Sequence, residues 1–190
     1  HLKTLLAKAN EMNMPKENYV RAVKRGLGEI AGNQYESYLY EGYCPHNVAV
    51  IVEMLSDNKN KAASEIRAAF NHNGGVLGDL GSVKWMFEKK GLIHATYNGA
   101  TEDALLELLI EYDIDDIDIE GKEIEIICNL LHLSDITKKM QDEGYYIEES
   151  IVGYHPKSTA QLDETAEEKV MEFLSILEAL EEVQHVYAAI

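Results

Sequence analysis

Hydrophobic and polar residues recur with different periods along the chain, and each period predicts a different element. Residues 47–55 are almost continuously apolar and rich in β-branched side chains, which is typical of a buried strand. Residues 59–72 repeat apolar side chains at helical spacing on one face, and residues 56–58 before them offer capping oxygens. Residues 82–88 alternate apolar and polar side chains, which predicts a half-buried strand. The middle of the chain therefore predicts a β-α-β run.

Residues 91–152 alternate twice between strand-like and helical spacing. The predicted elements are a strand at 92–97, a helix after Thr101, strands at 116–119 and 123–126, a helix after Ser134 and a strand at 145–152. Gly121 and Lys122 form a two-residue turn between the middle strands, which therefore predict a hairpin. The order βαββαβ is that of a ferredoxin-like unit.

The two ends of the chain complete the expected fold. Apolar positions at helical spacing on either side of Pro15 predict a helical hairpin, and residues 29–38 resemble a linker. A C-terminal amphipathic helix and a strand at 183–188 are expected to return to the central sheet. The predicted fold class is α+β, with three domains. They are an N-terminal helical hairpin or bundle (1–30), a discontinuous ferredoxin-like middle domain (36–90 plus 153–190) and a second ferredoxin-like domain (91–152) inserted into it.

The net charge of −17 is spread unevenly along the chain. Residues 1–28 carry +4, residues 29–100 carry −2 and residues 101–190 carry −19. A phosphate backbone is attracted to the first of these segments and repelled by the last. The acidic segment is expected to be a solvated face, with a protein partner as the alternative.

Cysteine usage and hydropathy place the chain among reduced, non-membrane proteins. Cys44 and Cys128 lie far apart and form no CxxC pair, so we expect two free thiols rather than a disulfide. No apolar run approaches the roughly 18 residues that a membrane helix needs, and no signal peptide is recognisable. We expect a cytoplasmic protein without a membrane partner.

The chain contains no recognisable enzyme motif. GxxxxGK[ST], HExxH and GxSxG are all absent. The glycines of residues 73–82 follow a helix and precede a strand, the reverse of a dinucleotide loop. They are expected to end the helix and lead into the strand, with close approach to a phosphate or sugar as the alternative. The chain is therefore predicted not to be an enzyme and to need no cofactor.

Two groups of residues raise the question of a metal site. The acids of residues 113–120 lack the spacing of a calcium loop, because Ile117 and Asp118 stand where that loop needs an acid and a glycine. Cys44, His46 and His72 offer three potential ligands without paired spacing. No metal site is predicted from either group.

Basic residues gather in two parts of the chain, and these are the candidate nucleic-acid contacts. The predicted contacts are Lys16, Arg21, Lys24 and Arg25 in the helical hairpin, and Lys59, Lys61, Arg67 and Lys84 in the middle domain. Tyr40, Tyr43 and Trp85 are aromatic groups that can stack on bases. For Trp85 a core position is the preferred interpretation, because Val83 and Phe87 share its face in the predicted strand.

Several segments closely resemble the YebC/PmpR family of probable transcriptional regulators. They are YEGY, VAVIVEMLSDNKNK, NHNGGVLGDLGSVKWMFEKKG, LDETAEE and VQHVY. The resemblance implies a DNA-binding transcriptional regulator. A mitochondrial member of the family is the translational activator of cytochrome c oxidase subunit I, which implies a ribosome-associated translation factor as the alternative. The expected partners are therefore DNA, ribosomal RNA or both, with a possible protein partner for the acidic domain.

The chain departs from the family pattern at three places. Relatives commonly carry a glycine-rich turn where this chain has residues 44–47, and arginines where it has Lys59 and Lys61. Lysine keeps the positive charge but loses the planar fork of arginine, so backbone contacts are favoured over base contacts at these two positions. The chain also begins at His1, and the resemblance implies a further basic segment before it.

Overall fold

The computed structural model describes residues 34–190, which form two compact units. Unit 1 comprises residues up to Phe87 together with Pro156–Ile190, and unit 2 comprises Glu88–His155. The predicted helical domain and its four basic candidates, Lys16, Arg21, Lys24 and Arg25, lie outside the described residues. Both units combine a sheet with helices, so the α+β class is confirmed. No helix among the described residues is both long and apolar enough to cross a membrane.

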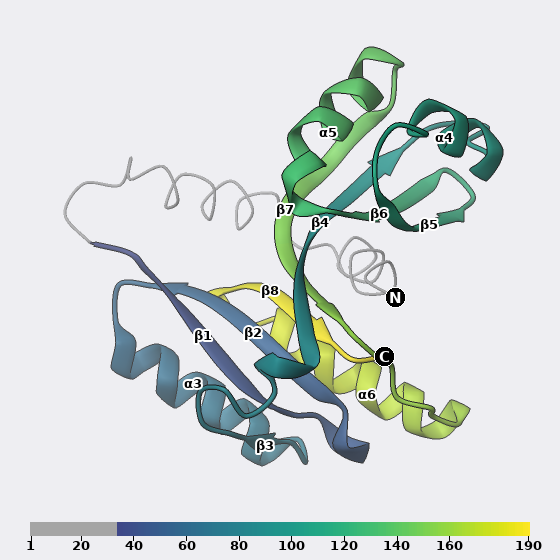
Figure 1. Ribbon diagram of the computed structural model, residues 1–190. Coiled ribbons are helices and arrows are strands. Elements are labelled where there is room, and N and C mark those ends of the chain that lie inside the picture. Colours follow the sequence, from purple (N-terminus) through teal and green to yellow (C-terminus); the bar gives the residue numbers. More distant parts are fainter. Residues whose placement is uncertain (1–33) are drawn as a thin grey trace. The chain divides into compact units, whose positions relative to one another are not determined.

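Unit 1 is a four-stranded sheet with two long helices on one face (Figure 1). Its elements are β1 (Glu36–Tyr43), η1 (Pro45–Asn47), β2 (Ala49–Ser56), α3 (Lys59–His72), β3 (Val76–Leu77), η2 (Lys84–Met86), α6 (Glu164–Glu178) and β8 (Val183–Ala188). The strand order is β3-β1-β2-β8, and each neighbouring pair is antiparallel. The C-terminal strand joins this sheet beside β2, as the order of elements predicts.

The helices of unit 1 pack on the sheet through buried apolar side chains. Phe70 of α3 and Phe173 of α6 meet edge to face, with ring centroids 5.1 Å apart. Such an arrangement of aromatic rings adds to the stabilisation from burial alone. Asn58 caps α3 by accepting a hydrogen bond from the backbone N–H of Lys61 at 3.1 Å. The predicted helix 59–72 therefore has its expected bounds and its capping oxygen.

Unit 2 has the element order βαββαβ (Figure 1). Its elements are β4 (Phe87–Thr96), α4 (Glu102–Leu108), β5 (Ile114–Glu120), β6 (Glu123–Cys128), η3 (Leu130–His132), α5 (Leu133–Asp142) and β7 (Tyr146–Pro156). The strand order is β5-β6-β4-β7, which agrees with the split βαβ arrangement expected for this segment. Ile93, Ile124 and Ile126 on the sheet form one core with Leu105 and Ile136 on the helices.

Three predictions about unit 1 are wrong. Residues 82–88 do not form a strand, because Lys84–Met86 make a 3-10 turn and β4 begins only at Phe87. Residues 36–38, expected in a linker, are the start of β1. With β1 added and the strand at 82–88 removed, unit 1 has the order ββαβ followed by αβ, which is not the ferredoxin-like order.

Candidate nucleic-acid interface

Helix α3 presents three of the predicted basic contacts, and the structure distinguishes between them. Lys59, Lys61 and Arg67 are all exposed. Among residues 34–190, neither Lys59 nor Arg67 has an ion-pair partner, whereas Lys61 has two. The Nζ atom of Lys61 lies 3.2 Å from the Glu182 carboxylate and 3.8 Å from that of Glu65. The hydrogen bond to Glu182 is the main reason that the pKa of Lys61 is raised.

The Lys61–Glu182 pair has a structural role. The Glu182 side chain is only 6% exposed, and Lys61 brings it a positive charge from a residue 121 positions away in sequence. A buried carboxylate that loses its only ion-pair partner among the described residues is costly, because nothing replaces the lost solvation. Lys61 is therefore the least available of the three α3 cations for a phosphate.

Replacing Lys61 by glutamine is expected to lower the urea concentration at the midpoint of unfolding, because the buried Glu182 side chain then loses its ion-pair partner. Lys59→Gln removes the same charge two residues earlier in α3, where no ion pair among the described residues is lost, and serves as the matched control. The measurement is urea unfolding followed by the fluorescence of Trp85. Equal midpoints for the two variants would contradict the structural role of Lys61.

Lys84, the fourth predicted contact in the described residues, lies on the other side of the sheet. A Cβ atom on Gly42 of β1 would meet Phe70 of α3, so position 42 faces the helices. Glu41 precedes it on the same strand and therefore points to the opposite face. The Glu41 carboxylate accepts the backbone N–H of Lys84 at 2.6 Å. The structure thus separates Lys84 from the cations of α3.

Glu41 organises the whole glycine-rich loop on that face. Its side chain is 2% exposed, and its two oxygens also accept the N–H groups of Gly81 at 2.6 Å and Val83 at 3.1 Å. The backbone carbonyl of Glu41 accepts the N–H of Gly78 at 2.8 Å. These four bonds tie residues 78–84 to β1, and they explain why the segment turns instead of extending as a strand.

This turn places Trp85 on the surface, so the preferred interpretation of Trp85 as a core residue is wrong. Its side chain is 65% exposed, whereas Val83 and Phe87 on either side are buried. The indole Nε1–H donates to the carbonyl oxygen of Ser82 at 3.0 Å, which limits the orientation of the ring. The alternation of apolar and polar residues at 82–88 favoured a strand and so concealed this turn. The closely spaced glycines of residues 73–82 were the one signal in the sequence that pointed to a turn. Tyr40 and Tyr43, the other aromatic candidates, are half-buried.

Unit 2 is the more acidic of the two units. Residues 88–155 contain 17 acidic and five basic residues, a formal net charge of −12. Lys90 is further neutralised by Asp115 at 3.0 Å, and Lys139 pairs with Glu111. An anionic phosphate backbone is therefore repelled by this unit as a whole.

One group in unit 2 has the composition of a metal site, and sequence reasoning missed it. His94 of β4, Glu123 of β6 and Glu148 of β7 form the single such group within residues 34–190. His94 is 6% exposed, with Nε2 3.1 Å from Glu123 and Nδ1 2.9 Å from Glu148. Each carboxylate approaches a different nitrogen of the same ring, from the strands on either side of β4. No local pattern marks these residues, since their contact depends on strand register.

The three residues considered for a metal in unit 1, Cys44, His46 and His72, form no such group among the described residues. Burial raises the pKa of the Cys44 thiol to about 12, so it remains protonated and is a poor ligand. Cys128 is likewise buried, with a pKa raised to about 11. Both cysteines are free thiols in the structure.

Comparison with known proteins identifies the relatives of this chain. Residues 35–190 match the family model described as the second and third domain of TACO1/YebC. A protein from Thermotoga petrophila, named a probable transcriptional regulatory protein, is 40% identical over 188 residues, which cover 98% of this chain and 74% of the relative. A protein of the same name from Treponema pallidum is 40% identical over 187 residues, which cover 98% of this chain and 76% of the relative.

A solved structure is also similar throughout. The crystal structure of a conserved hypothetical protein from Aquifex aeolicus superposes with a TM-score of 0.79 at 38% identity. The match covers 99% of this chain and 78% of that protein. Sequence and fold agree, and the chain belongs to the TACO1/YebC family, whose relatives here carry the name of probable transcriptional regulatory proteins.

Proposed function

We propose that this protein is a nucleic-acid-binding regulator of gene expression, and specifically a DNA-binding transcriptional regulator in the cytoplasm. The observation that carries the proposal is the state of Lys59 and Arg67. Both are exposed on α3, and neither has an ion-pair partner within residues 34–190. Exposed cations without carboxylate partners are available to neutralise phosphates and release counterions. The names of the relatives favour DNA as the target.

The proposed mechanism is contact with the phosphate backbone rather than a chemical reaction. The cations of α3 would bind phosphates, and the acidic unit 2 would stay in solvent or face a protein. Lys16, Arg21, Lys24 and Arg25 would add contacts from the segment before residue 34, as its charge predicts. Because backbone contacts carry no sequence information, α3 is expected to supply affinity and position rather than specificity.

A second candidate is a ribosome-associated translation factor that binds ribosomal RNA. The exposed indole of Trp85 is the observation that favours it. Aromatic side chains stack on the unpaired bases of RNA loops and ends, whereas the bases of a DNA duplex are already stacked on each other. The same α3 cations would then contact ribosomal RNA phosphates.

Double charge reversal tests the role of α3. Lys59→Glu with Arg67→Glu is expected to weaken binding to duplex DNA and to ribosomal RNA by about tenfold or more at low salt, because two phosphate contacts become repulsive. The slope of log affinity against log salt concentration should fall in magnitude by about two. Fluorescence anisotropy with labelled nucleic acids provides both quantities.

Lys122→Glu with Lys138→Glu is the matched control. It changes the charge equally, on exposed residues of the acidic unit 2. This variant should bind nearly as the parent does, and an equal loss of affinity would show that total charge rather than α3 determines binding.

Ribosome co-sedimentation separates the two candidates. Lysate is fractionated with and without nuclease, at two salt concentrations, and a parallel pull-down recovers DNA fragments. Salt-sensitive association with ribosomal particles that survives digestion of messenger RNA supports the translation factor. Absence from ribosomes, with recovery of particular DNA fragments, supports the transcriptional regulator.

A further inference from the structure

We infer that Trp85 is a stacking platform for an unpaired nucleobase, and that the loop 78–86 presents it as the single-strand binding site of unit 1. This inference rests on the proposed function, since it specifies how a nucleic-acid-binding protein engages its target. The ligand class is single-stranded nucleic acid, either RNA or DNA, recognised by the flat face of a base and by the phosphates beside it.

The first argument is the exposure of a large aromatic ring on a fixed loop. Tryptophan side chains are on average highly buried, so the 65% exposure of the Trp85 indole needs an explanation. The ring is held by the bond from Nε1 to the carbonyl of Ser82, and its loop is held by Glu41. A preorganised ring loses little conformational entropy on stacking, which favours binding.

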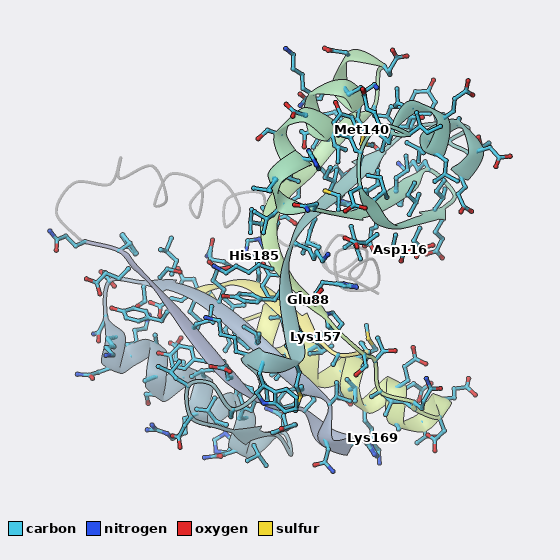
Figure 2. The ribbon with its side chains drawn as sticks, viewed as in Figure 1. Glu88, Asp116, Met140, Lys157, Lys169 and His185 are labelled. Carbon is cyan, nitrogen blue, oxygen red and sulfur yellow. The ribbon has the colours of Figure 1, made fainter. Side chains whose placement is uncertain are left out.

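The second argument is the positive charge next to the ring. Lys84 precedes Trp85 directly, and the backbone N–H of Lys157 donates to the carbonyl oxygen of Met86 at 2.9 Å. The backbone of Lys157, a residue labelled in Figure 2, therefore lies beside Met86 although the two are distant in sequence. Both lysine residues are exposed. An exposed aromatic ring with lysines on residues next to it matches a nucleotide, which offers a base face and a phosphate a few ångströms apart.

The third argument concerns the alternative of a protein partner. Leu80 is also exposed in this loop, and a purely apolar partner would cover it together with Trp85. Such a partner would also have to cover the exposed Lys157 without supplying opposite charge, which is costly. A nucleotide strand satisfies both features at once, so it is the better match for this surface.

The experiment uses the chain's single tryptophan as its own probe. The protein is titrated with labelled oligo-U and oligo-dT strands of about twelve nucleotides, a length in the range of single-strand sites, and with a blunt duplex of the same length. Anisotropy gives the affinity, and Trp85 fluorescence reports stacking. We expect quenching by the single strands that saturates with the anisotropy change, and little quenching by the duplex. Stronger binding of oligo-U than of oligo-dT identifies RNA as the preferred ligand, and the reverse identifies DNA.

Substitutions then separate stacking from charge. Trp85→Ala is expected to weaken single-strand binding by about five- to 100-fold, the range for loss of one base–aromatic stack, and Trp85→Phe should retain part of the affinity. Tyr146→Ala is the matched control, since Tyr146 is a comparably exposed ring, 68%, on the acidic unit 2. Circular dichroism verifies that each variant is folded.

The outcomes distinguish this inference from the proposed function. If the parent binds nucleic acid but Trp85→Ala binds as tightly and the parent shows no quenching, the stacking site is wrong and the proposed function stands. In that case the exposed loop is a surface for protein. If no single strand, duplex or ribosomal RNA binds at low salt, the proposed function fails and the inference fails with it.

Discussion

Glu41→Ala is expected to lower the free energy of unfolding of unit 1 by about 3–5 kcal/mol, because it leaves several backbone donors without their charged acceptor. The carboxylate is 2% exposed and accepts three N–H groups, from Gly81, Val83 and Lys84. Hydrogen bonds to a charged group are stronger than those between neutral groups. In a buried place, water does not replace the lost acceptor of these backbone N–H groups. Urea unfolding followed by Trp85 fluorescence measures the effect, since Trp85 lies in this unit.

The same substitution should also release the loop that carries Trp85. Hydrogen exchange at the amides of residues 81–84 is expected to become much faster than in the parent, while exchange in α3 changes less. Glu172→Ala, which removes an exposed glutamate from α6, should leave both stability and loop exchange near the parent values. Unchanged exchange in the loop of the Glu41 variant would show that other contacts hold it.

Glu41→Gln adds a finer comparison. Glutamine keeps the shape of the side chain but replaces one acceptor oxygen with an N–H₂ group, which then faces a backbone donor. We expect a loss of stability between those of the alanine variant and the parent. The single-strand affinity of this variant should fall with it, since Trp85 would be less firmly held.

Elements defined by local pattern could be predicted from the sequence. The buried strand β2, the helix α3 with its Asn58 cap and the hairpin of β5 and β6 all depend on residues close together in the chain. Periodicity and capping oxygens act over these short distances, so they are visible without a structure. Unit 2 was predictable for the same reason, because its elements follow one another with short connections.

Features that depend on long-range contacts could not be predicted. The turn at Lys84–Met86 arises because Glu41, about 40 residues earlier, binds its backbone N–H groups, and this overrides an alternation typical of a strand. The pairing of Lys61 with Glu182 spans 121 residues and changes which cations are available. The sequence placed four of the candidate contacts in unit 1, but their division between two sides of the sheet required the structure.

The second large effect concerns pH and Glu178, the last residue of α6. Burial raises the pKa of this carboxyl to about 7, from an ordinary value of 4.5, and His185 lowers it only in part. The negative end of the α6 dipole also disfavours the carboxylate. Between about pH 4.5 and pH 7 the folded protein holds a proton that the unfolded chain has lost. The stability of unit 1 therefore falls as pH rises through this window, and the loss is complete above it.

Glu178→Gln removes this titration, because glutamine stays neutral. The measured quantity is the free energy of unfolding of the variant minus that of the parent. We expect this difference to be about 2–3 kcal/mol more favourable to the variant near pH 8 than near pH 5. Glu172→Gln, on the exposed face of the same helix, should show no comparable change with pH. The gain is a difference between two pH values, so any constant cost of placing an amide in the site cancels. A difference between variant and parent that stays the same at both pH values would mean that Glu178 ionises in the folded protein as it does in the unfolded chain.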